Sequence, residues 1–182
     1  MPHPALESSP EPRTRKSTVE GSVNALATLP VGPVTYQLRR ATAADLAAVV
    51  ELLAADQLGA TRESAADLAP YRTAFAAIDA DPAQLLLVAT TGDQVVATMQ
   101  LTFIPGLARR GALRAQIEAV RVHEQHRSHG LGGEMFKWAI DEARRRGCAL
   151  VQLTTDKQRA DAHRFYQRLG FTASHEGFKL AL

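Results

Sequence analysis

The feature that most constrains this 182-residue chain is a turn with three glycines, Gly130, Gly132 and Gly133, between two segments of regular structure. Before the turn, residues 114–122 (RAQIEAVRV) have the length and composition of a strand. After it, apolar residues recur at helical spacing from about residue 132 to residue 146. A helix that begins this way leaves backbone N–H groups without intrahelical partners at the positive end of its dipole. Because glycines let a phosphate approach that backbone, we expect a phosphate-binding turn here.

The rest of the sequence predicts an α/β (α+β) domain with a mixed, mostly antiparallel sheet and helices on both faces. Further strands are expected from residue 34 and over residues 84–90, 95–104, 148–155 and 171–182, and further helices after the capping box Thr42–Asp45 and over about 62–80 and 159–170. The run CALVQLTT (148–155) is continuously apolar, which favours a central strand buried on both faces.

Residues 1–33 are rich in Pro, Ser, Thr and charge and show no lasting periodicity. Such a segment buries too little apolar area to offset its ordering entropy. We therefore expect a disordered tail over residues 1–33 and a folded domain over residues 34–182.

Composition narrows the class of protein. Hydrophobic residues make up 46% and charged residues 22%, as in ordinary globular domains. A net charge of +2 gives no reason to expect nucleic acid or a membrane as partner, and the basic turn LARRGALR (107–114) is typical of a solvated hairpin tip. The single cysteine, Cys148, excludes an internal disulfide and favours a reducing compartment, so we expect a cytoplasmic protein.

Two familiar phosphate motifs and a metal site fit the turn poorly. A Walker A loop needs Lys followed by Ser or Thr after its last glycine, but Glu134 follows Gly133. The dinucleotide fingerprint needs a different glycine spacing at the first strand of a parallel unit. Three histidines, His123, His126 and His129, recur every three residues, but they lie in an expected loop without cysteines or a second histidine pair nearby. We expect no metal.

A second motif gives the turn a narrower meaning. Residues 127–132 read Arg-x-x-Gly-x-Gly, and residues 162–171 (AHRFYQRLGF) read A-x-x-x-Y-x-x-x-G-F. In this order, separated by one helix and one strand, the pair resembles the GNAT superfamily of N-acetyltransferases, over residues from about 35 to 182. The resemblance implies a GNAT acyl-CoA N-acyltransferase fold and an enzyme that moves an acetyl group from acetyl-CoA to a primary amine.

The resemblance also implies a site. Strands 114–122 and 148–155 would splay into a V-shaped slot, where backbone groups of Val120 and Val122 pair with the pantetheine arm. The turn would hold the pyrophosphate through its N–H groups. The residues expected to contact acetyl-CoA are Val120, Arg121, Val122, Arg127, Ser128, His129, Gly130, Leu131, Gly132 and Gly133.

Acyl transfer to an amine requires a base, because an alkylammonium group has a pKa near ~10.4. Glu118 is the expected base: by the period of two it shares one side of its strand with Val120 and Val122. The alternative is an ion pair with Arg114 or Arg121. The resemblance implies that Tyr166 is the acid that protonates or hydrogen-bonds the departing thiolate, and the alternative is a packing role.

Several assignments stay open. Many family members carry an Asn that contacts pantetheine, but at that place this chain reads TTDKQ (154–158). Thr155 and Asp156 are the two candidates to replace the Asn. Lys157 and Arg159 either contact the CoA phosphates or belong to a solvated surface. The acceptor is a small-molecule amine or a peptide amine, and a homodimer is one of the assemblies left open. The alternative function is a catalytically idle domain that binds acyl-CoA as a sensor or scaffold.

Overall fold

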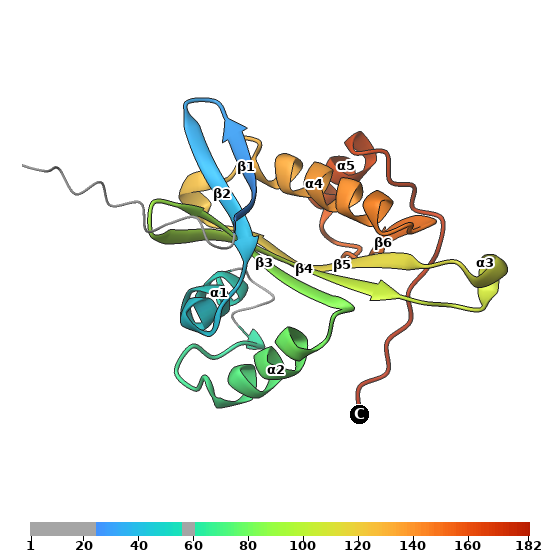
Figure 1. The fold of residues 1–182 in the computed structure, drawn as a ribbon, viewed down its shortest axis with the longest axis horizontal. Coiled ribbons are helices and arrows are strands. Elements are labelled where there is room, and N and C mark those ends of the chain that lie inside the picture. The colour runs from blue at the N-terminus through green and yellow to red at the C-terminus, as the bar shows by residue number, and fades with distance from the viewer. Residues whose placement is uncertain (1–24, 56–60) are drawn as a thin grey trace, which may run out of the picture.

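The computed structural model describes residues 25–55 and 61–182, which form a six-stranded sheet with helices on both of its faces (Figure 1). The strands are β1 (Ala25–Val31), β2 (Val34–Arg40), β3 (Gln84–Thr91), β4 (Gln94–Ile104), β5 (Arg114–Val122) and β6 (Leu150–Leu153). The helical segments are η1 (Ala43–Asp45), α1 (Leu46–Ala54), α2 (Ala69–Ala80), α3 (Ala108–Gly111), η3 (Glu124–His126), α4 (Leu131–Arg145) and α5 (Ala160–Arg168). Neighbouring strands follow chain order and are antiparallel, except that β5 and β6 are parallel. The predicted fold class is confirmed.

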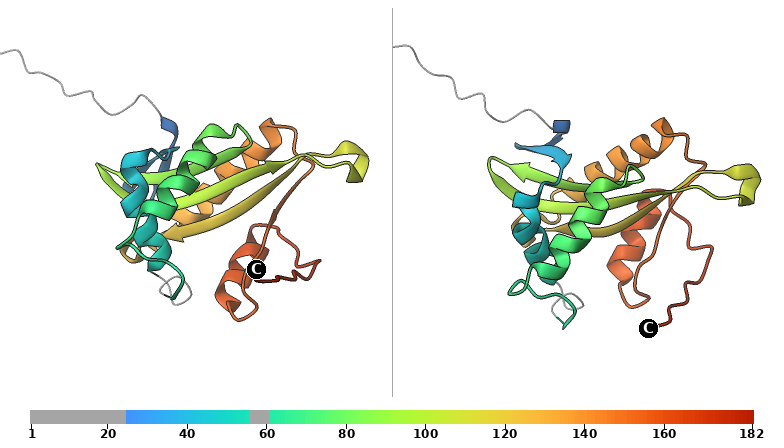
Figure 2. Two further views of the ribbon diagram at one scale, coloured as in Figure 1. Left: turned by 90° about the horizontal axis from the view of Figure 1, so that it is seen from below. Right: turned by 60° about the horizontal axis from the view of Figure 1, so that its bottom comes forward.

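The two faces of the sheet carry separate apolar cores. Figure 2 shows α1 and α2 on one side of the sheet and α4 on the other. Alternation along β3 explains both: Leu86 and Val88 pack beneath α1 and α2, whereas Leu85 and Leu87 belong to the core beneath α4. From its first turn onward, α4 buries side chains at helical spacing: Leu131, Met135, Phe136, Ala139 and Ala143.

β1 corrects the predicted boundary at residues 33 and 34. Leu29 and Val31 are only 6% and 7% exposed, and β1 pairs with β2 along its length. The strand contains Pro30, which is tolerated because β1 lies at the sheet edge, where a missing N–H breaks no ladder. Gly32, with φ 57°, provides the turn into β2. The expected tail therefore ends before residue 25, and residues 1–24 lie outside the described part of the chain.

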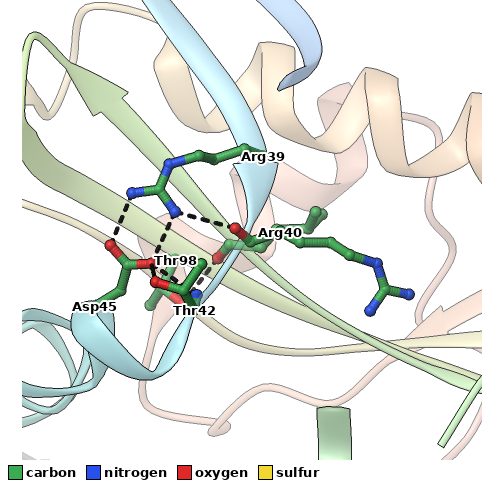
Figure 3. Close-up of polar contacts among 6 residues, drawn as sticks. Arg39, Arg40, Thr42, Asp45 and Thr98 are labelled. Carbon is green, nitrogen blue, oxygen red and sulfur yellow. Dashed lines mark hydrogen bonds and ion pairs between the residues drawn. The ribbon is translucent and has the colours of Figure 1, made fainter. Parts of the chain in front are cut away.

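Arg39 and Asp45 anchor α1 to the sheet (Figure 3). The Arg39 guanidinium donates from Nη1 and Nη2 to the two carboxylate oxygens of Asp45, both at 2.7 Å. That carboxylate also accepts from the backbone N–H and the hydroxyl of Thr42, at 2.7 and 2.8 Å, so the predicted capping box is confirmed. Burial raises the pKa of Asp45, but the bonds from Arg39 and Thr42 outweigh this and hold the pKa at about 2.

The C-terminal part of the chain departs from the prediction in two places. β6 has four half-buried residues and forms the edge of the sheet, whereas its apolar run predicted a central strand buried on both faces. Residues 171–182 form no strand, and Phe178, Leu180 and Leu182 are exposed. Apolar content indicates strand propensity, but a ladder also needs a paired backbone alongside, which the local sequence does not specify.

The ends of two helices follow local signals. α2 begins at Ala69, later than the predicted start at 62, because Pro70 is favoured in a first helical turn. α4 ends at Arg145, and Gly147, the predicted residue after the C-cap, has a φ of 75° and donates its N–H to the Arg144 carbonyl at 3.0 Å. Within residues 25–55 and 61–182, no helix has the length and apolar character to cross a bilayer.

Candidate active site

β5 leaves part of one edge open. β4 pairs with β5 from Arg114 to Val122, but β6 pairs only with the first part, Arg114–Ile117. The expected divergence of the two strands is therefore present. The N–H of His123 donates to the Val96 carbonyl of β4 at 2.8 Å, so by alternation the backbone groups of Val120 and Val122 point away from β4. Beyond the point where β6 ends, no strand of the described residues pairs with these groups, and we call this stretch the free edge of β5.

A bulge bends β5 where this free edge begins. Thr98 pairs with Arg121 and Gln100 pairs with Glu118, so two steps along β4 match three steps along β5. Ala119, with φ 53°, is the extra residue and adopts a left-handed conformation that costs a non-glycine residue energy. The bulge separates the first part of β5, which pairs with both β4 and β6, from its last part, which pairs with β4 alone.

The bulge also corrects the predicted orientation of Glu118. Its partner row across the sheet includes Leu86, which packs beneath α1 and α2, so Glu118 lies on that face. Arg121 lies one row along on the same face, whereas Val120 and Val122 pack against the core beneath α4. The predicted shared side is wrong because a period of two assumes an unbroken strand.

Two arginine side chains lie against the free edge. Arg121 donates from Nη1 to the Val120 carbonyl at 2.9 Å, and Arg127 donates from Nε to the Val122 carbonyl at 2.7 Å. Both carbonyls keep a second lone pair for another donor. Arg127, which was expected at the mouth of the turn, is exposed and is held beside the last residue of β5.

The turn before α4 is fixed at its base and has a special backbone at its tip. The buried Tyr36 hydroxyl is hydrogen-bonded to His126 Nδ1 at 2.9 Å, which joins the turn to β2. Ser128 and Gly130 have φ values of 61° and 102°. α4 then begins at Leu131 without a side-chain cap, so the N–H groups of its first turn have no intrahelical acceptor and point out of the helix.

The backbone requires glycine at only one of the three glycine positions of the turn. Gly130 needs its positive φ. A Cβ on Gly132 would lie 3.9 Å from Phe165 Cζ and from Val122 Cγ2, an ordinary contact, and a Cβ on Gly133 would meet nothing within 4 Å. The described protein atoms therefore do not require glycine at positions 132 and 133. Bare backbone at these positions fits a ligand that contacts the N–H groups directly.

Gly132 also shows which elements meet. Its nearest neighbours are Val122 at the end of β5 and Phe165 on α5, so the start of α4, the free edge and α5 converge. Phe136 of α4 packs against Phe165, Tyr166 and Phe171 with ring centroids 5.4–6.1 Å apart. The two sequence motifs are therefore neighbours in space.

Tyr166 belongs to that aromatic cluster, so its packing role is real, but packing does not account for its hydroxyl. Among the described residues, the hydroxyl has no hydrogen-bond partner. Burial raises the pKa of Tyr166, and the nearby charges of Arg159 and Arg121 partly offset this. The phenol is therefore protonated at neutral pH and available as a donor.

Glu118 is exposed, and no other described residue forms an ion pair with it. The alternative expected from the sequence, an ion pair with Arg114 or Arg121, is absent from this part of the chain. The carboxylate thus lies exposed beside the bulge on the α1 and α2 face, without an ion pair from residues 25–55 or 61–182.

The structure distinguishes Thr155 from Asp156, the two residues after β6 that the sequence left as alternatives for the pantetheine contact. Asp156 Oδ1 accepts from the Gln158 N–H at 2.9 Å, which stabilises the local turn. Thr155 Oγ1 is buried and has no hydrogen-bond partner among the described residues. A buried hydroxyl without a partner is costly, so Thr155 is the one that fits a contact with a bound molecule. Lys157 pairs with Glu176 at 3.3 Å on the surface.

The histidines of the turn have structural partners. His126 contacts Tyr36, and His123 Nδ1 accepts from the Gln125 N–H at 3.4 Å. Burial, with smaller contributions from His123 and His129, lowers the pKa of His126. Over residues 25–55 and 61–182, no three His, Cys, Asp or Glu side chains are placed to hold a metal ion.

Comparisons with known proteins agree with this arrangement. The model of the acetyltransferase (GNAT) family matches residues 46–171. An aminoalkylphosphonate N-acetyltransferase of Salmonella typhimurium is 32% identical over 146 residues, which cover 80% of this chain and 91% of that relative. A crystal structure of a Bacillus halodurans C-125 protein, described as a transcriptional regulator, has a TM-score of 0.78 and 46% identity, over 81% of this chain and 99% of that one. An Agrobacterium tumefaciens C58 protein assigned as an acetyltransferase has a TM-score of 0.71 and 31% identity, over 80% of this chain and 99% of that one.

Proposed function

The chain belongs to the GNAT acetyltransferase family, and we propose that it transfers the acetyl group of acetyl-CoA to a primary amine by direct attack on the thioester. Membership of the family makes it an acyltransferase. The observation that carries the finer proposal is the convergence of three features: the bare N–H groups at the start of α4, the free edge of β5 and the Tyr166 hydroxyl.

The donor would be held mainly by backbone. The free edge at Val120 and Val122 offers N–H and C=O groups that an extended pantetheine arm matches as an added strand. N–H groups from Arg127 to Gly133 hold the pyrophosphate at the positive end of α4. The Thr155 hydroxyl takes the place of the Asn that many family members carry and donates to pantetheine.

The acceptor nitrogen must lose a proton before its lone pair attacks. We assign this step to Glu118, which is unpaired and lies beside the bulge, and the proton reaches it through a water molecule. The nitrogen then bonds to the thioester carbonyl carbon and releases its second proton to water, and the C–S bond breaks as the amide forms. A main-chain N–H of β5 near the bulge stabilises the oxyanion that forms between these two events.

The departing thiolate takes the proton of the Tyr166 hydroxyl. Burial keeps that phenol protonated, and it has no protein partner among the described residues that would compete for the proton. Arg121 and Arg159 lie close enough to lower its pKa, which favours proton release when negative charge develops on sulfur.

For the acceptor we propose an amine that carries an anionic group. The Salmonella relative acts by name on aminoalkylphosphonates. In this chain Glu118 is exposed, so it offers a base to the amine of such an acceptor.

A thiol-release assay with acetyl-CoA and a panel of amines tests the proposal. We expect turnover with 2-aminoethylphosphonate, much less with uncharged propylamine, and loss of turnover in Glu118→Gln. Turnover only with peptide amino termini would reassign the acceptor. CoA binding without thiol release across the panel would instead support the catalytically idle alternative.

A further inference from the structure

A polar cavity lies at the C-terminal end of α4, opposite the end that follows the glycine turn. It has a volume of about 140 Å³ and lies between α4 and the start of the sheet. Its polar lining comes from Arg40 of β2 and from Glu142, Arg145 and Arg146 at the end of α4, and Trp138 forms part of its wall. We call it the arginine pocket.

Two of the three arginines have partners that explain them. Glu142, which is 7% exposed, pairs with Arg145 and with Arg146 Nε, the latter at 2.7 Å. The Arg146 guanidinium also lies over the Phe103 ring, 4.0 Å from its centroid. These contacts neutralise a buried carboxylate and place cations at the negative end of the α4 dipole.

Arg40 has no comparable explanation. Arg40 is half-buried, and within the described residues its guanidinium forms one hydrogen bond, to the Gln84 carbonyl at 3.5 Å, which is the limit of such a bond. Its neighbour Arg39 forms a bidentate pair with Asp45. Figure 3 shows the two side chains leaving β2 in opposite directions. One arginine has a carboxylate and the other has a cavity.

We propose that the arginine pocket binds a phosphate-sized oxyanion, with Arg40 as the main ligand. Three guanidinium groups face one carboxylate there, so the lining carries excess positive charge even after the roughly −0.5 charge of the helix end is counted. Guanidinium groups match tetrahedral oxyanions with paired donors.

This site is separate from the donor site of the proposed function. α4 has 15 residues, which at about 1.5 Å per residue separates its ends by roughly 22 Å. The simpler account, that the arginines only neutralise Glu142 and the end of the helix, applies to Arg145 and Arg146. It does not apply to Arg40, which comes from another element.

The pocket contains its own reporter, because Trp138 is the single tryptophan of the chain. Inorganic phosphate is titrated into the full chain while KCl keeps the ionic strength constant, and tryptophan fluorescence is followed. We expect a saturable change in the wild type. Arg40→Gln should weaken the apparent affinity at least about tenfold, and Arg40→Lys should weaken it less, because lysine keeps the charge and loses the paired donors.

Arg144→Gln is the matched control. Arg144 is on the same helix end but pairs with Asp141 on the surface and does not line the pocket, so its loss should leave the affinity unchanged. Gly132→Glu, which blocks the glycine turn, should also leave the fluorescence response intact. A response that does not saturate, or equal affinities in the wild type and both Arg40 variants, would overturn the proposal. Because no acetyl transfer is measured, this result is independent of the enzymatic function.

Discussion

The anchor of α1 and the candidate active site differ in how completely their polar groups are hydrogen-bonded. Around Asp45 both carboxylate oxygens accept hydrogen bonds, from Arg39 and from Thr42. In the candidate site the Thr155 hydroxyl is buried without a partner among the described residues. The hydroxyl of the half-buried Tyr166 also has no described partner, and the first turn of α4 lacks a side-chain cap. Buried polar groups without partners are costly and few in native proteins. This difference fits an anchor that stabilises the fold and a site that we propose binds a ligand.

Tyr166→Phe gives the largest expected effect. The ring keeps its contacts with Phe136, Phe165 and Phe171 and loses only the proposed proton donor. General acid catalysis contributes about 10²- to 10⁴-fold, so kcat should fall by that order while KM for acetyl-CoA and the melting temperature change little. Steady-state kinetics and thermal denaturation of the variant measure both. Unchanged turnover would leave Tyr166 as a packing residue and remove the contrast with the anchor.

Asp45→Ala tests the opposite region. It leaves the half-buried Arg39 without its carboxylate and removes the cap of α1, so the free energy of unfolding should fall by about 3 kcal/mol. The kcat of the folded fraction should be unchanged. Asp141→Ala is the control, because Asp141 and Arg144 are 65% and 73% exposed and such a pair contributes about 0.5 kcal/mol or less. Equal losses in the two variants would mean that the anchor is no more than a surface pair.

Acid should weaken the anchor before it changes the packing of the site. The pKa of Asp45 is lowered from 3.8 to about 2, so its ionised form stabilises the fold fully above pH 3.8 and progressively less as pH falls toward 2. The contribution lost is about 2 kcal/mol. Urea unfolding at pH 6, 4, 3 and 2 measures it. Asp45→Asn should flatten this part of the profile, and a profile identical to the wild type would show that other carboxylates dominate.

The sequence located the glycine turn and the tyrosine motif more accurately than the strands around them, for identifiable reasons. Gly130, Gly132 and Tyr166 lie in motifs with fixed spacing, and local chemistry ties each to a turn or a helix. The strand at residues 25–31 was missed because Pro30 and Gly32 resemble loop signals, although an edge strand tolerates the proline. The predicted orientation of Glu118 was wrong because Ala119 is one extra residue in the strand.

Burial was the other quantity that the sequence could not supply. Thr155 and Asp156 are adjacent and equally polar, and only the fold shows that one hydroxyl is buried without a partner while the other side chain stabilises a turn. Arg39 and Arg40 present the same problem. Adjacent arginines on one strand point to opposite faces, and tertiary packing decides which one finds a carboxylate.

Gly132→Ala should keep or raise the stability of the protein and lower its affinity for CoA. The new Cβ meets ordinary contacts at 3.9 Å, and alanine favours a helix over glycine by up to about 1 kcal/mol, so the melting temperature should rise or stay level. The affinity for CoA, measured by calorimetry, should fall about tenfold because the methyl group covers backbone that faces the pyrophosphate.

Gly147→Ala is its counterpart at the other end of the same helix. There φ is 75°, so alanine should cost about 1 kcal/mol of stability and leave CoA affinity unchanged. If both variants shift affinity alike, the first turn of α4 has no special part in binding.

Thr155→Val gives the smallest expected effect and the sharpest form of the comparison. Valine keeps the shape of threonine and removes a buried hydroxyl that has no partner among residues 25–55 and 61–182. The free protein should therefore be as stable as the wild type or slightly more stable. The same change should raise the Kd for CoA several-fold, since a hydrogen bond contributes about 1 kcal/mol. Thr154→Val is the matched control, because Thr154 is exposed and should tolerate the change in both measurements. A loss of stability in Thr155→Val without a loss of affinity would place this hydroxyl with the anchor, as a structural group, and remove it from the site.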